Sequence, residues 1–323
     1  MRRILATLAL SVSMLAASAA IPTAADAATW TEVSTTVDVP CAFLTYHPAA
    51  DWYFPATSSP KALVYLQHGF SRSNGNMQDL AEHYAAAGFL VFAPTLPSAD
   101  IYGCTVNNLG NNTPFLNNVA AWLGTATSST GNLAKSYAKA AAAAGRSGQA
   151  LPSKYVIAGH SAGGESATYI ANRLRTTYPP AFAKLKFVQL LDPVKSVFGN
   201  NEPAALAGLK TTSLPILAIS SPPYLGNSNA SGTVALTDAL DRPFLGVRLV
   251  TGCHCDAEGA STDSLCTLLD GTPQAKNITA LQTLAVAWAV DAADGTTTAT
   301  YYPGGAYYQG LLTTGVTQTL SGS

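Results

Sequence analysis

The chain has 323 residues, enough for one large domain or two of ordinary size. Hydrophobic residues make up 48% of it and charged residues only 11%, which argues against a disordered chain and predicts a large buried core. The formal net charge is −1, without a basic or acidic block, so the sequence does not favour nucleic acid, which needs a positive surface.

The N-terminal residues have the layout of a secretory signal peptide. Arg2 and Arg3 precede an apolar run and then a stretch of small residues. "ADA" ends a predicted signal peptide of residues 1–27 and gives a mature start near Ala28, while "ASA" at 17–19 is a second cleavage site. The apolar run is short for a membrane span. We therefore expect a secreted protein, extracellular or periplasmic, without stable membrane insertion.

After this segment, apolar runs alternate with helical patterns. Short β-like runs open the mature chain at 31–40 and 41–48. Further strands are predicted at 61–70, 89–97, 154–161, 186–194, 214–221 and 246–255, and helices at 76–88, 114–126, 133–145, 163–179 and 278–295. This alternation predicts an α/β fold, a mostly parallel central sheet with helices on both faces. Residues 28–295 form one predicted domain, and for the Thr-, Gly- and Tyr-rich tail, 296–323, we expect a small edge hairpin or partial disorder.

The stretch "KYVIAGHSAGG" places a serine between two glycines at the end of a predicted strand. Gly159 and Gly163 flank Ser161 in a G-x-S-x-G pattern, with an amphipathic helix directly after it. Such a sharp strand-to-helix turn exposes a serine hydroxyl at a helix N-terminus. An ordinary tight turn is the alternative, but the strand–turn–helix context favours a nucleophile.

A serine nucleophile needs a base, and His254 is the histidine that follows Ser161 in the chain. It lies where the last predicted strand breaks into a loop. The other histidines fit structural roles better: His47, His68, His83 and His160. Of these, His160 directly precedes Ser161 in the chain, so its side chain should point away from the serine.

The acid that orients the base should lie between the serine and the histidine. Asp192 ends an apolar strand, and the carboxyl ends of strands are where open α/β sheets place their chemistry. An Asx turn before Pro193 is the structural alternative. Glu165 should point along its helix. The remaining acids lie in polar segments where carboxylates are usually solvated: Glu202, Asp238 and Asp241.

The developing oxyanion needs hydrogen-bond donors, and "QHGF" follows an early strand where one such donor is expected. We assign the backbone N–H groups of Phe70 and Ala162 to this role. Gly69 would let the loop approach the substrate, and His68 would hold the loop by hydrogen bonds.

The segments "QHGF", "GHSAGG" and "LLDPV" resemble those of secreted α/β-hydrolases of the serine esterase type. They are similar to the chlorophyllase-like and platelet-activating-factor acetylhydrolase-like branch, which is related to bacterial cutinases and polyester hydrolases. The resemblance covers roughly residues 40–292. In many cutinase-like enzymes the acid follows the next strand, but here that strand ends "AISSPPYLG" without an acid, which favours Asp192 and disfavours a polyester substrate.

Five cysteines suit an exported chain, and their odd number means that at least one is unpaired or pairs outside the chain. Cys253 or Cys255 is expected to bridge to Cys266, and Cys41 to Cys104. Zinc bound by "CHCD" is the alternative, but a structural zinc site needs two separated ligand pairs. We expect disulfides and no metal.

Together these patterns predict a serine carboxylester hydrolase with a Ser161–Asp192–His254 triad and no cofactor. An apolar ester, small or polymeric, is the expected substrate. Two alternatives stay open: a peptidase or amidase with the same triad, and a non-catalytic binding protein that keeps the fold. The oligomeric state does not follow from the sequence.

Overall fold

A computed structural model describes residues 30–323 of the chain. The predicted signal peptide and Ala28 lie outside the described residues. One nine-stranded sheet organises the structure, with an adjoining hairpin of β2 (Val39–Cys41) and β3 (Leu44–Tyr46). In spatial order the sheet consists of β1 (Thr31–Thr36), β4 (Ala49–Phe54), β6 (Leu90–Pro94), β5 (Leu63–Gln67), β7 (Tyr155–His160), β8 (Leu185–Leu191), β9 (Ile216–Ser220), β10 (Gly246–Leu249) and β11 (Thr317–Leu320).

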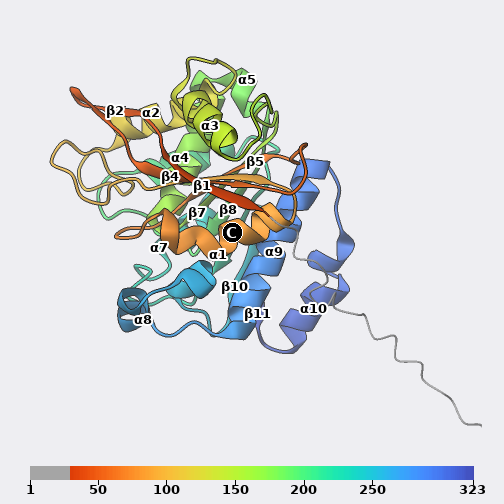
Figure 1. Ribbon diagram of the computed structural model, residues 1–323. Coiled ribbons are helices and arrows are strands. Elements are labelled where there is room, and N and C mark those ends of the chain that lie inside the picture. Colours follow the sequence, from red (N-terminus) through yellow and green to blue (C-terminus); the bar gives the residue numbers. More distant parts are fainter. Residues whose placement is uncertain (1–29) are drawn as a thin grey trace, which may run out of the picture.

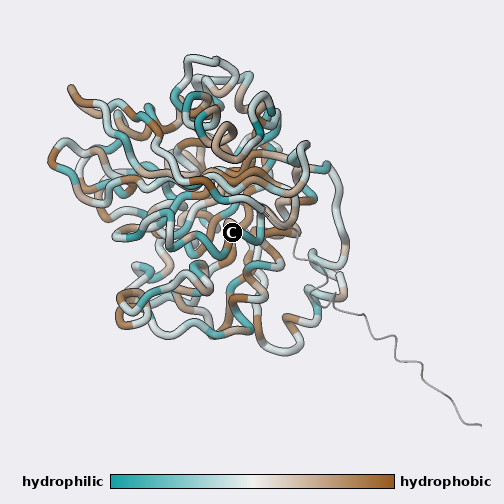
Figure 2. Tube along the Cα trace, viewed as in Figure 1, coloured by the Kyte–Doolittle hydropathy of each residue, from teal (hydrophilic) through white to brown (hydrophobic). Residues whose placement is uncertain are grey.

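The sheet is mixed. The strands from β6 to β10 run parallel, whereas β1 and β4 at one end and β11 at the other run antiparallel to their neighbours. The strands β5, β6, β7 and β9 are buried at every position, and the centre of the tube in Figure 2 is brown. Such strands need cover on both faces. The prediction of an α/β fold with a mostly parallel sheet is confirmed, and the antiparallel ends are the difference.

Helices cover both faces of the sheet (Figure 1). One face packs on α2 (Thr113–Gly124), α3 (Asn132–Ala143), α4 (Ala162–Thr177), α6 (Asn201–Leu209) and α7 (Ser231–Ala239). The other packs on α1 (Gln78–Ala86), α9 (Ala275–Asp294) and α10 (Ala306–Thr313). Short helical segments complete the fold: η1 (Asn74–Met77), α5 (Pro179–Phe182), η2 (His254–Ser261), α8 (Ser264–Asp270) and η3 (Ala299–Tyr301).

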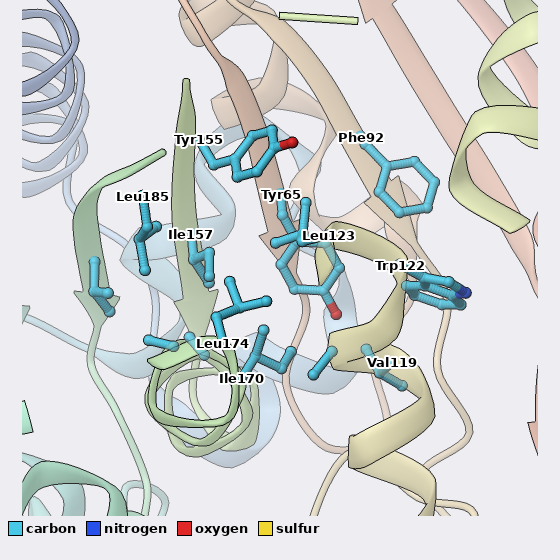
Figure 3. Close-up of a cluster of buried hydrophobic side chains, with 14 of the residues drawn as sticks. Tyr65, Phe92, Val119, Trp122, Leu123, Tyr155, Ile157, Ile170, Leu174 and Leu185 are labelled. Atoms are coloured by element: carbon cyan, nitrogen blue, oxygen red, sulfur yellow. The ribbon is translucent and has the colours of Figure 1, made fainter. Parts of the chain in front are cut away.

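The helix α4 is fixed to the sheet by apolar contacts (Figure 3). Ile170 and Leu174 face Ile157 of β7, and Trp122 of α2 meets the ring of Phe92 edge-on, with centroids 5.7 Å apart. Burying a side chain of this size contributes about 1.5–3 kcal/mol. This packing holds the N-terminus of α4, and with it Ser161, at the end of β7.

The C-terminal tail is ordered, which corrects the two expectations for it. It forms η3, α10 and the edge strand β11, which pairs antiparallel with β10. Tyr308 belongs to the same buried cluster as Trp288, and both rings pack against Phe244; this apolar anchor lies in a segment rich in Thr and Gly. None of the helices in residues 30–323 combines the length and the apolar character that crossing a bilayer requires.

Candidate active site

Ser161 lies at the sharp turn between β7 and α4, as its sequence context predicts. Its φ of 57° and ψ of −125° belong to a strained conformation that residues other than glycine rarely adopt. A Cβ on Gly159 would collide with the main-chain carbonyl of Gly163, and one on Gly163 would lie 2.5 Å from the carbonyl oxygen of Gln67. The two glycines therefore allow the close helix–strand approach that this turn requires.

His254 and Asp192 are in direct contact across the sheet end. The imidazole Nδ1–H of His254 donates to Asp192 Oδ2 over 2.6 Å, and the backbone N–H of Ser221 donates to Asp192 Oδ1 over 2.8 Å. Asp192 follows β8 directly, and His254 begins η2 shortly after β10. With Nδ1 bound to the carboxylate, the ring has Nε2 left for Ser161.

Ser161 and His254 line one cleft, which has a volume of about 480 Å³. The Ser161 hydroxyl and His254 Nε2 do not form a hydrogen bond with each other, and such bonds are often long without substrate. The structure thus joins the predicted acid and base and places both beside the predicted nucleophile.

Burial alone would lower the pKa of His254, but the hydrogen bond and the charge of Asp192 outweigh it, so the net pKa is raised above 6.5. A general base must be neutral to accept a proton. We therefore expect kcat/KM for ester hydrolysis to rise with pH, with a midpoint above the ordinary histidine value. A pH–rate profile from about pH 5 to 9 measures this midpoint. A midpoint at or below 6.5 would contradict the proposed His254–Asp192 coupling.

Two further side chains hold His254, and sequence reasoning missed both. His160 Nε2–H donates to the His254 carbonyl over 2.9 Å, with the two rings 4.5 Å apart, and the His254 N–H donates to the Tyr224 hydroxyl over 2.7 Å. Burial and then the charge of His254 lower the pKa of His160, so it stays neutral. His160 faces the base, a contact that no sequence spacing signals.

The loop that carries Phe70 is held by His68, as expected. Its Nδ1–H donates to the Gly69 carbonyl over 2.7 Å, and its Nε2 accepts the Leu96 N–H over 2.9 Å. Burial lowers the pKa of His68 to about 4, which keeps the ring neutral in this tautomer.

The two predicted oxyanion donors flank the serine. A Cβ on Gly69 would lie 2.6 Å from Ser161 Cβ, which shows how close this loop comes to the serine. Within residues 30–323, neither the Phe70 N–H nor the Ala162 N–H donates to another group. Both are therefore available to a bound oxygen.

A second cleft, with a volume of about 280 Å³, meets the first at Ser161 and Phe70. We call the two the smaller and the larger cleft. The larger one contains the buried Arg72, whose guanidinium donates to both oxygens of Glu258 over 2.6 Å. This ion pair ties the loop that follows Phe70 to the η2 segment that follows His254.

The other acids lie away from the base. Asp238 and Asp241 are exposed. Glu165 is buried in α4 and accepts the Ser196 N–H over 2.6 Å. Glu202 was expected in a solvated irregular segment, and that expectation is wrong. It lies fully buried in α6, where burial and then the charge of Glu165 raise its pKa to about 8.

The cysteines form two disulfides, Cys41–Cys104 and Cys255–Cys266, which confirms those pairings and selects Cys255 over Cys253. Burial raises the pKa of the remaining Cys253 thiol to about 12, so it is not a thiolate. In the described part of the chain, the side-chain groupings with metal-ligand spacing consist of disulfide-bonded cysteines with Asp100 or Asp270. Disulfide sulfurs do not offer the thiolates that a zinc site uses.

The Cys255–Cys266 bridge closes a short loop directly after His254. Breaking it with Cys266→Ser should lower Tm, because a bridge across a loop of this size contributes about 3 kcal/mol, and should lower with it the nitrophenyl ester hydrolysis that the sequence predicts. Differential scanning fluorimetry and a nitrophenyl ester assay measure the two effects. Cys253→Ser is the matched control and should change Tm little. An unchanged Tm in Cys266→Ser would show that the bridge does not stabilise this segment.

Comparison with protein-family models and with curated proteins finds no match for the chain. The functional argument therefore depends on the residues and their geometry.

Proposed function

We propose that the chain is a secreted serine carboxylester hydrolase of the α/β-hydrolase fold. The observation that carries this proposal is the 2.6 Å hydrogen bond between His254 Nδ1 and the buried Asp192, with His254 lining the same cleft as the strained Ser161. A buried carboxylate and imidazole beside a serine at a strand-to-helix turn are the parts that acyl transfer needs.

The chain order of these parts supports the fold assignment. The nucleophile follows β7, the acid follows β8 and the base follows β10, all at the carboxyl ends of parallel strands. The order serine, acid, histidine is that of α/β-hydrolases. The two disulfides are typical of oxidising compartments and support secretion.

In the proposed reaction, Ser161 Oγ attacks the ester carbonyl carbon while His254 Nε2 takes the hydroxyl proton. Asp192 holds the ring in the tautomer with hydrogen on Nδ1 and stabilises the imidazolium. The carbonyl oxygen becomes an oxyanion and accepts hydrogen bonds from the Phe70 and Ala162 N–H groups. In other enzymes one such donor is worth about 2.7–4 kcal/mol.

The tetrahedral intermediate then collapses. The bond to the leaving alkoxide breaks, and the alkoxide receives the proton from His254, which leaves an acyl group on Ser161. Water attacks this acyl-enzyme and gives its proton to His254, and the carboxylic acid leaves as the Ser161 hydroxyl is restored. The atoms balance with water as the co-reactant.

The proposal is tested on the purified secreted chain with 4-nitrophenyl acetate, 4-nitroacetanilide and a fluorophosphonate probe. Ester hydrolysis with covalent labelling of Ser161, located by mass spectrometry, is the expected result. Faster cleavage of the anilide than of the ester would favour an amidase. Absence of both labelling and hydrolysis would overturn the proposal in favour of a binding protein.

A further inference from the structure

The two clefts meet at Ser161 but differ in which reacting group they contain. His254 lines the larger cleft, whereas Ala162, whose N–H faces the oxyanion in the proposed reaction, lines the smaller one. The leaving alcohol must take its proton from His254, so it has to lie on the side of the ring. The acyl group then extends the other way, into the smaller cleft.

The smaller cleft contains a polar side chain without a partner. Asn107 is 8% exposed, and its Oδ1 is buried without a hydrogen bond. The Nδ2 atom of Asn107 also donates to no group in residues 30–323, but unlike Oδ1 this atom is not fully buried. The Oδ1 atom is enclosed by protein, so a ligand in the cleft does not reach it. The Nδ2 group is not enclosed, and Asn107 lines the smaller cleft, so its N–H donors are free for an acceptor oxygen of a ligand bound there.

The backbone around Asn107 is fixed, although its side chain is unpaired. The Thr105 hydroxyl donates to the Asn107 carbonyl over 2.6 Å, and the next residue, Asn108, donates its N–H to Ser196 Oγ over 2.8 Å. Ser196 is in turn bound to Glu165 of α4, the helix that begins directly after Ser161. Asn107 is therefore held in a set position relative to the serine.

We propose that Asn107 is a specificity-determining residue that donates a hydrogen bond to an oxygen on the acyl group of the substrate. This inference rests on the proposed esterase function and narrows its substrate class to short acyl groups that carry a hydroxyl, keto or second ester oxygen. The cleft volume of about 280 Å³ limits the length of the acyl group. The larger cleft, with about 480 Å³, takes the leaving alcohol.

The test compares two esters that share one leaving group and differ in one polar atom. These are 4-nitrophenyl 4-oxopentanoate and 4-nitrophenyl 4-methylpentanoate. The native protein should prefer the oxo ester in kcat/KM, and Asn107→Leu should reduce this preference by about 3- to 10-fold, the range of one hydrogen bond. Asn107→Asp, which keeps the shape but lacks the N–H donor, should act in the same direction if the leucine variant does not fold.

Leu225→Ala is the matched control, because Leu225 lines the larger cleft and is 89% exposed. It should leave the acyl preference unchanged and alter the ratio of 4-nitrophenyl acetate to 1-naphthyl acetate hydrolysis. An unchanged acyl preference in both Asn107 variants would overturn the inference while ester hydrolysis itself still stands. If the Asn107 variants changed only the ratio of 4-nitrophenyl acetate to 1-naphthyl acetate hydrolysis, the smaller cleft would hold the leaving alcohol and not the acyl group. That result would also overturn the inference. A native protein that hydrolyses no ester would refute the proposed function itself.

Discussion

Ser161→Ala should lower kcat for ester hydrolysis by about 10⁴- to 10⁶-fold, the loss seen when a triad nucleophile is removed elsewhere. Alanine retains the Cβ but has no oxygen to attack the carbonyl carbon. The fold should persist, because the Ser161 side chain has no hydrogen-bond partner within residues 30–323, and its hydroxyl borders an open cleft, so its loss opens no new cavity. Steady-state kinetics on 4-nitrophenyl acetate measure the loss, and circular dichroism and Tm serve as folding controls.

The same variant should no longer react with a fluorophosphonate probe. Retention of more than about a tenth of native turnover would exclude Ser161 as the nucleophile, because the remaining oxyanion donors and binding groups give only a small part of triad catalysis. A variant that is inactive but also unfolded would show that the strained turn, and not only its hydroxyl, depends on serine.

Asp192→Asn should lower turnover by about 10⁴-fold with little change in shape. An asparagine amide can present an N–H to His254 Nδ1, which favours the tautomer with hydrogen on Nε2, and that tautomer cannot accept the serine proton. The midpoint of the pH–rate profile should also fall, because the carboxylate that raises the pKa of His254 is gone.

Asp238→Asn and Asp241→Asn are matched controls, since both side chains are exposed. They should keep native turnover. An active Asp192→Asn together with an inactive control variant would move the acid to the later segment, as in the cutinase-like arrangement. Tm is measured in parallel. An unchanged Tm with low turnover indicates loss of the acid, whereas a lowered Tm indicates that the Ser221 N–H contact to Asp192 is lost as well.

The parts of the site that the sequence predicted are those set by local rules. A buried strand followed by G-x-S-x-G places Ser161, and an acid at a strand end places Asp192. Both rules depend on neighbouring residues, so a single sequence contains the necessary signal. The central strands and α4 were predicted for the same reason, because long apolar and amphipathic patterns are local.

The parts that were missed depend on contacts distant in the chain. Glu202 lies in a polar stretch, but α6 packs it beneath α4 and buries it. Tyr224 reaches the His254 N–H from an irregular loop. In both cases, hydropathy and spacing favour exposed or irregular structure, and tertiary packing decides otherwise.

The glycines around Ser161 tolerate no larger side chain, whereas the loops that line the clefts do. A side chain at residue 159 or 163 would meet main-chain atoms, and one at Gly164 would lie 2.7 Å from Pro193 Cβ. The cleft walls, by contrast, come from loops with exposed side chains, among them Leu109, Phe198 and Leu225. Substitutions in these loops can therefore change which molecules the clefts accept while the turn that holds Ser161 stays the same. A mutagenesis library confined to the loops should retain a larger share of folded variants than one that includes the glycines.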